Sequence, residues 1–143
     1  MTPTASALAW TTEEVRVAGS SVRLRTTGHG APLLVLHHDI GTPDQLPFYE
    51  ALAERFTMLL PSHPGYDGSK RPAWMRSVRD VAVTYQALLA ARGLADVSLV
   101  GLGFGGWIAA EMATMSPRGF RRWCWWGRWG SSRRTARSST RRW

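Results

Sequence analysis

One glycine-rich turn constrains the fold of this chain more than any other feature of the sequence. Residues 96–100 form a short apolar run typical of a buried strand, residues 101–106 read Gly-Leu-Gly-Phe-Gly-Gly, and residues 107–115 follow as a helix. Glycines in such a turn indicate that neighbouring backbone comes too close for a Cβ atom. The unit therefore predicts an α/β fold with a buried, mostly parallel sheet.

The segments before this turn repeat the alternation of strands and helices. A hairpin is predicted around Gly19, and continuous apolar runs then predict strands buried on both faces. Ser77 and Asp80 predict a capping box at the start of a helix. The expected strands cover 13–17, 22–26, 32–36 and 56–60, and the expected helices cover 47–55 and 77–92.

The sequence of the glycine turn matches the patterns of two unrelated motifs. As G-x-G-x-x-G, Gly101, Gly103 and Gly106 would hold a dinucleotide pyrophosphate at the N-terminus of the helix. That motif also needs an acidic residue about 20 positions later, and no Asp or Glu follows Glu111. The alternative is a nucleophile elbow, a sharp strand-to-helix bend that projects one side chain above the sheet. The projected residue would be Gly103.

Three blocks of sequence, in the same order and at similar spacing, resemble the α/β-hydrolase family. Residues 33–37 resemble the strand and histidine before that family's oxyanion loop, residues 61–69 resemble its Pro-Gly-rich loop, and residues 97–113 resemble its elbow strand, turn and helix. The resemblance covers residues 11–117 and implies an α/β-hydrolase-type sheet with flanking helices that stops after the elbow helix. It implies hydrolysis of an ester, amide or similar bond in a small molecule, with no cofactor.

The groups that would carry this chemistry are missing. The family places a Ser, Asp or Cys at the elbow, with a later His as base and an acid that orients the His. Gly103 has no side chain, and no His, Asp or Glu follows Glu111. We therefore expect the chain to be inactive as written. Two explanations stay open: loss of activity, or a specialised, non-catalytic binding module for a small molecule or a protein.

The resemblance also implies where an oxyanion would bind. Its donors would be the backbone N–H groups of Asp39 and Phe104, with His38 and Asp39 in place of the small residues that the family often has there. The Asp39 carboxylate would oppose an oxyanion unless it points away.

The histidines before the glycine turn are candidates for other chemistry. His37 is expected to be a buried structural residue, with His38 or Asp39 lining the pocket. No metal is expected, because neighbours on an extended chain face opposite ways and cannot readily share one ion. His63 is expected to pack its loop, and the serines of that loop are not on a strand-to-helix bend.

Charge separates the chain into two parts. Residues 1–117 carry a net charge of −1, whereas residues 118–143 hold nine Arg, no acidic residue and five of the eight Trp. The first part is predicted to be the hydrolase-like domain. The second is predicted to be a tail without strand or helix periodicity, disordered or out of frame. The alternative is an evolved basic arm that binds nucleic acid through phosphate contacts and stacking.

The single cysteine and the first ten residues favour a cytoplasmic location. One Cys excludes an internal disulfide framework, and residues 1–10 hold neither a basic start nor a long apolar run. We expect a cytoplasmic protein with a small-molecule ligand, no membrane contact and no specific nucleic-acid partner.

The genetic code offers an explanation of the tail. Trp has the single codon TGG, so residues 123–127 read TGG-TGC-TGG-TGG-GGN if Cys124 uses TGC. After a preceding C, the frame one base back reads CTG-GTG-CTG-GTG-GGG and encodes Leu-Val-Leu-Val-Gly, the kind of strand that the family places after the elbow helix. We therefore hypothesise that the frame is lost near Arg122, which would leave strand 96–100 as an exposed sheet edge. The DNA downstream of Arg122 tests this hypothesis.

Overall fold

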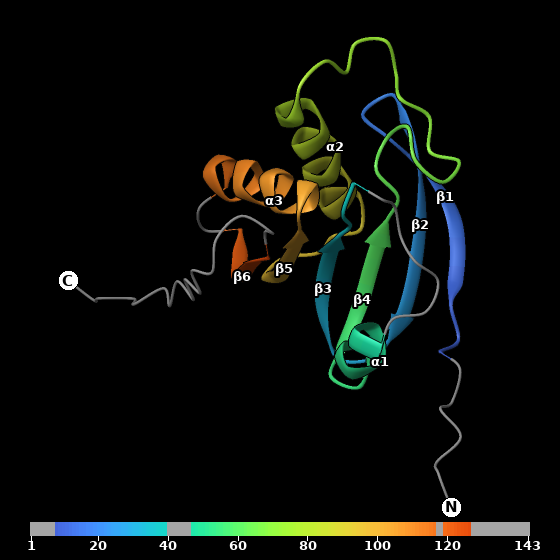
Figure 1. Cartoon of the computed structure of the whole chain (residues 1–143), viewed down its shortest axis with the longest axis vertical. Helices are drawn as coiled ribbons and strands as arrows, with labels where there is room; N and C mark the ends of the chain where they lie inside the picture. The colour runs from blue at the N-terminus through green and yellow to red at the C-terminus, as the bar shows by residue number, and fades with distance from the viewer. Residues whose placement is uncertain (1–7, 40–46, 117–118, 127–143) are drawn as a thin grey trace, which may run out of the picture.

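The computed structural model describes residues 8–39, 47–116 and 119–126. In this part the chain forms one six-stranded sheet, with the strand order β1-β2-β4-β3-β5-β6, and three helices (Figure 1). The strands are β1 (Thr11–Val17), β2 (Ser20–Gly28), β3 (Ala31–Leu36), β4 (Phe56–Pro61), β5 (Val97–Leu102) and β6 (Phe120–Trp126), and the helices are α1 (Pro47–Ala53), α2 (Val78–Ala91) and α3 (Phe104–Met115). Every strand and helix predicted before residue 117 is present, with ends that differ by no more than three residues.

The sheet is mixed, with its antiparallel part on one side. β1 pairs with β2 through the hairpin predicted around Gly19, and β2 pairs antiparallel with β4. In contrast, β3 lies parallel between β4 and β5, and β5 pairs parallel with β6. The mostly parallel α/β sheet predicted from the sequence is confirmed. Chain order reverses at β3, and open α/β sheets bind ligands at the carboxyl ends of the strands beside such a reversal.

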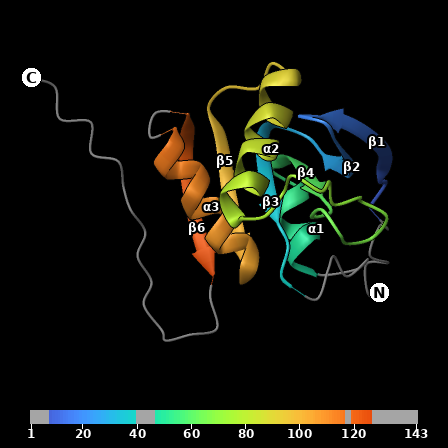
Figure 2. The same cartoon turned by 90° about the horizontal axis from the view of Figure 1, so that it is seen from above.

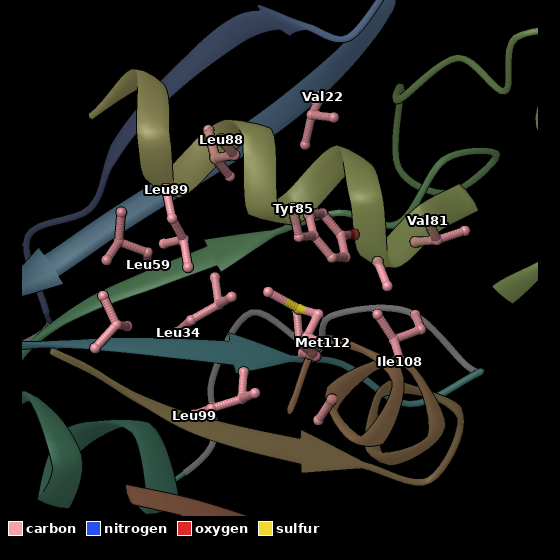
Figure 3. Close-up of a cluster of buried hydrophobic side chains, with 14 of the residues drawn as sticks. Val22, Leu34, Leu59, Val81, Tyr85, Leu88, Leu89, Leu99, Ile108 and Met112 are labelled. Atoms are coloured by element: carbon pink, nitrogen blue, oxygen red, sulfur yellow. The ribbon is translucent and has the colours of Figure 1, made fainter. Parts of the chain in front are cut away.

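Helices cover both faces of the sheet. Helices α2 and α3 lie side by side (Figure 2) and bury their apolar sides against the strands in the larger core (Figure 3). Helix α1 packs Tyr49 and Ala53 into a second, smaller core. Because successive strand residues point to opposite faces, β3 supplies Leu34 and Leu36 to the first core and Leu33 and Val35 to the second. This explains the continuous apolar run of β3.

A capping box fixes the start of α2, as the sequence predicts. The Ser77 side chain accepts a hydrogen bond from the Asp80 N–H at 3.2 Å, and the Asp80 carboxylate accepts from the Ser77 N–H at 2.9 Å. The N–H of Arg76 donates to the same carboxylate at 2.8 Å, and these backbone donors lower the pKa of Asp80. The box therefore satisfies backbone groups that helix formation leaves without partners.

The structure corrects one prediction about the tail. The sequence predicts no strand after residue 118, but β6 forms there and pairs with β5 over its length, from Val97↔Phe120 to Leu102↔Trp126. Strand β5 is therefore not an exposed sheet edge. The prediction failed because it rested on the absence of Leu, Ile and Val from this segment. The hydrogen bonds between strands are made by the backbone, whatever the side chains, and aromatic residues also favour strands. The frame-loss hypothesis stays a prediction, and residues 127–143 lie outside the described part.

No helix among the described residues is long and apolar enough to cross a bilayer.

Candidate functional site at the glycine turn

The loops after β3 and β5 meet at one edge of the sheet. Leu36, the last residue of β3, is paired in register with Gly101 near the end of β5. The residues that follow each strand, His37 to Asp39 on one side and Gly103 on the other, therefore emerge next to each other. The sequence predicts both segments as site elements, and the parallel pairing of their strands brings them together.

The glycine turn is a tight bend from β5 into α3. Gly103 has φ 54° and ψ −115°, a backbone conformation that residues with side chains rarely adopt. A Cβ atom at Gly101 would lie 2.5 Å from the Gly105 carbonyl oxygen and from the Gly106 Cα. The strand and the helix thus pack backbone against backbone, as the sequence predicts.

The imidazole of His38 occupies the place of a side chain at residue 103. A Cβ atom built on Gly103 would lie 2.5 Å from His38 Nε2 and 3.0 Å from His38 Cγ, far inside contact distance. On its other nitrogen, Nδ1, the ring contacts the Asp39 carboxylate. The His38 side chain remains 40% exposed, so it is accessible from solvent. The sequence predicts His38 or Asp39 in the pocket, and the structure places His38 directly at the bend.

The two expected oxyanion donors flank this imidazole. Phe104 is the first residue of α3, where a backbone N–H has no acceptor within the helix. Asp39 follows His38 directly, and its carboxylate is turned toward Nδ1 of the ring. Nδ1 is not the nitrogen nearest Gly103, so the Asp39 charge is directed at His38. The oxyanion role of these two N–H groups stays a prediction.

His37 lies in a buried cluster beneath the site, which we call the imidazole cluster (His37, His63 and Tyr85). His37 is fully buried, and its ring stacks on that of His63 with centroids 3.6 Å apart. Its Nδ1–H donates to the His38 carbonyl at 2.5 Å, and its Nε2 accepts from the His63 backbone N–H at 2.8 Å. These contacts brace the loop after β3, which is the structural role that the sequence predicts for His37.

His63 completes the imidazole cluster. Its Nε2–H donates to the His37 carbonyl at 2.8 Å, and its Nδ1 accepts from the Tyr85 hydroxyl at 2.5 Å. Burial, with a smaller contribution from His37, lowers the pKa of His63 to about 3, and burial also lowers the pKa of His37 and raises that of Tyr85. Both histidines are therefore neutral and fully bonded. Sequence reasoning does not single out Tyr85, since nothing in the local sequence indicates a partner for its hydroxyl.

A cleft of about 240 Å³ opens beside the glycine turn, between the loop after β4, the start of α2 and Phe104. Its walls combine apolar side chains with one cation: His63, Pro64, Tyr66, Arg71, Met75, Ser77, Val81 and Phe104. Arg71 is held by a hydrogen bond from its Nε to the Met75 carbonyl at 3.0 Å. The sequence shows the Pro-Gly-rich loop but not which of its residues face the cleft, because that depends on how the loop folds over α2.

The loop serines and the cysteine do not join the site. Ser69 Oγ donates to the Ser62 carbonyl at 2.8 Å and accepts from the Arg23 N–H at 2.9 Å, so it fastens the loop to β2. Cys124 is exposed on β6. Among the described residues, no three His, Cys, Asp or Glu side chains gather in a way that could hold a metal ion.

Comparisons with known proteins identify the family of this chain. A sequence model described as "Alpha/beta hydrolase family" matches residues 10–141. Among curated proteins, the chain is similar to a 1-acylglycerol-3-phosphate O-acyltransferase of Arabidopsis thaliana, with 33% identity over 95 residues, or 62% of this chain and 23% of the relative. The chain therefore spans about a quarter of the length of this relative.

Solved structures show the same fold. A putative acyltransferase from Salmonella enterica superposes with a TM-score of 0.73 and 25% identity, over 87% of this chain and 43% of the other. An epoxide hydrolase superposes with a TM-score of 0.71 and 25% identity, over 82% of this chain and 42% of the other. The described sheet and helices thus correspond to less than half of each of these proteins.

Proposed function

Because the chain belongs to the alpha/beta hydrolase family, we propose that it is a carbonyl-binding domain for small-molecule esters, amides or similar compounds, in which residue 103 forms no covalent intermediate. The observation that carries this proposal is the bend at Gly103, which keeps the tight geometry of a nucleophile-bearing turn while the His38 imidazole fills the place of the side chain. A hydrolase of this parent type attacks its substrate with that side chain. Here residue 103 supplies no group for that attack.

The ester class is supported by the surroundings of the turn. In the proposed complex the Phe104 N–H, which has no acceptor within α3, would donate to the carbonyl oxygen of the ester. The cleft beside it would offer the apolar walls of Met75, Val81 and Phe104 to the acyl chain. Similarity to proteins named as acyltransferases points the same way, since acyl transfer and ester hydrolysis both pass through attack on an acyl carbonyl.

Supplying a nucleophile at the turn tests this proposal. We combine Gly103→Cys with His38→Gly, which clears the space, and with Cys124→Ser, which removes the native thiol. A thiol is nucleophilic without a partner base. On incubation with p-nitrophenyl butyrate, we expect the introduced thiol to gain one butyryl group at least about 10-fold faster than exposed Cys124 does in the unmodified chain, because the turn stabilises the oxyanion. Intact-protein mass spectrometry measures both rates.

Two controls accompany this measurement. The chain with Cys124→Ser alone should carry no stable butyryl group. Gly103→Cys with His38 retained should react more slowly than the triple variant, because the imidazole occupies the same space. The φ of 54° strains any side chain at residue 103 by about 1–3 kcal/mol, so far-UV circular dichroism must first show each variant folded. An introduced thiol that reacts no faster than Cys124 would contradict ester binding at the turn.

A non-catalytic binding module is the second candidate function, and the cleft favours it. A largely apolar cavity of about 240 Å³ with a single cation can hold a ligand without any chemistry at the turn. Under this alternative the chain retains a ligand such as butyrate but never turns over its ester.

A further inference from the structure

We infer that His38 and Asp39 are the reactive pair of this site, and that the imidazole over Gly103 acts as a general base, activating a water molecule to attack a bound carboxylic ester. The inference rests on the proposed ester binding at the glycine turn and deepens it. A partly exposed imidazole, an adjoining carboxylate and a bend that lacks a side chain lie together here.

The His38 imidazole lies where a nucleophilic side chain would begin. His38 Nε2 lies 2.5 Å from where a Cβ atom of residue 103 would be, so it stands at the point from which a nucleophilic side chain would reach the substrate. Phe104 directly follows Gly103, so a carbonyl bound to its N–H would lie beside the imidazole, with space for the attack to pass through one water molecule. At 40% exposure, the His38 side chain is open to water.

The carboxylate supplies the orientation. The Asp39 carboxylate lies against Nδ1 of the His38 ring, and its negative charge favours a proton on Nδ1 over one on Nε2. Nε2 then keeps its lone pair, and this is the nitrogen that faces Gly103. A carboxylate in this position also stabilises the imidazolium that forms when Nε2 takes a proton. The negative charge of Asp39, which would oppose an oxyanion, therefore supports the base.

The other histidines of the sequence, all within the described part, are not available for this role. Both ring nitrogens of His37 and of His63 are engaged in hydrogen bonds within the imidazole cluster. His29 is exposed between β2 and β3, at the amino end of β3, whereas the site lies at its carboxyl end. His38 is thus the histidine whose Nε2 faces the turn.

The proposed step balances with water as the only co-reactant. Water loses a proton to His38 Nε2 as its oxygen forms a bond to the acyl carbon, and the carbonyl oxygen becomes an oxyanion facing the Phe104 N–H. The oxyanion then collapses, the bond from the acyl carbon to the alcohol oxygen breaks, and the leaving alkoxide takes the proton from Nε2. The products are a carboxylic acid and an alcohol, and His38 returns to its neutral form.

The geometry also makes the two residues interdependent. A side chain at residue 103 and the present position of the His38 ring exclude each other, because their atoms would overlap. A glycine at residue 103 is therefore a requirement for the imidazole to reach the site. This gives the glycine a role other than loss of activity.

Hydrolysis of p-nitrophenyl butyrate by the full chain tests the inference. We expect slow but catalytic release of p-nitrophenol, and His38→Gln, which keeps the size but removes the base, should lower kcat/KM by at least about 10-fold. The matched control is His29→Gln, which removes an exposed imidazole outside the site and should leave kcat/KM unchanged. Gly103→Ala should lower the rate as His38→Gln does, because the new methyl group displaces the ring.

Chemical rescue separates a base from a structural residue. In His38→Gly the ring is replaced by a space that opens to solvent, so added imidazole should restore a saturable part of the lost rate. It should restore none in His38→Gln, where the amide fills the space. Asp39→Asn should lower kcat more than it raises KM, since it affects the base and not the cleft.

Three results would overturn the inference: no hydrolysis by the full chain above that of buffer, an equal loss in His29→Gln, or no rescue of His38→Gly. If these occur while the introduced thiol of the triple variant still accepts a butyryl group, ester binding stands and only the role of His38 fails. If that thiol accepts none, the proposed function fails with it.

Discussion

At the scale of single residues, His63 makes stability depend on pH. Its pKa is about 3 in the folded chain and about 6.5 when the ring is solvated, so between these values the unfolded chain binds the proton and the folded chain does not. Its contribution is complete above pH 6.5 and is lost as pH falls toward 3. The free energy of unfolding should therefore drop by up to about 1.4 kcal/mol per pH unit from this residue alone.

Urea titrations between pH 7 and pH 5 measure this slope, in a range where the carboxyl groups change little. His63→Gln removes the titrating ring and should make the curve less steep, while His37, whose pKa burial also lowers, leaves part of the slope. The variant is expected to lower stability at pH 7 as well, through the lost bond to Tyr85. His29→Gln, at an exposed position, should leave the slope as it is. A curve equally steep in His63→Gln would show that the ring is not held neutral in the folded protein.

At the scale of elements, the capping box sets the position of α2 and hence of the cleft wall that Ser77 and Val81 form. Ser77→Ala removes the acceptor for the Asp80 N–H and should lower the free energy of unfolding by about 1 kcal/mol. Ser77→Asp keeps an acceptor at the same place and should stay within a few tenths of a kcal/mol of the parent. Equal losses in both variants, measured by chemical denaturation, would mean that the side chain acts by packing and not by capping.

At the scale of the whole molecule, β6 forms the outermost strand of the sheet on the side of β5. It covers β5, whose residues Val97 and Leu99 belong to the core, and it presents exposed Arg121 and Arg122. Charged side chains on an outermost strand discourage pairing with other chains. The part of the tail that forms β6 therefore acts with the domain, while residues 127–143 carry six further Arg.

Two deletions distinguish these parts. A chain ending at residue 126 keeps β6 and should retain its thermal melt, elute as a monomer and lose salt-sensitive retention on heparin, because most of the excess positive charge is gone. A chain ending at residue 118 loses β6 and should aggregate through the exposed edge of β5. Identical elution and melting of the two chains would show that β6 contributes nothing to the fold.

The sequence predicted the elements well because their causes are local. Apolar runs, the capping pair at Ser77 and the glycines of the turn each act within a few residues, and all reappear in the structure. It failed at β6, where the residues lack the usual aliphatic pattern and the strand forms by pairing with β5. It also gave no sign of the Tyr85 hydroxyl as a partner for His63, which depends on how α2 packs on the sheet.

The sequence by itself determined that the bend after β5 has no side chain at its apex, because that follows from the identity of Gly103. Only the tertiary structure decided what stands there instead. The parallel pairing of β3 with β5 brings His38 to Gly103, and the imidazole enters a space that exists only because a Cβ atom is absent. Residue identity is written in the chain, whereas the contact between two distant residues depends on the register of the sheet that carries both.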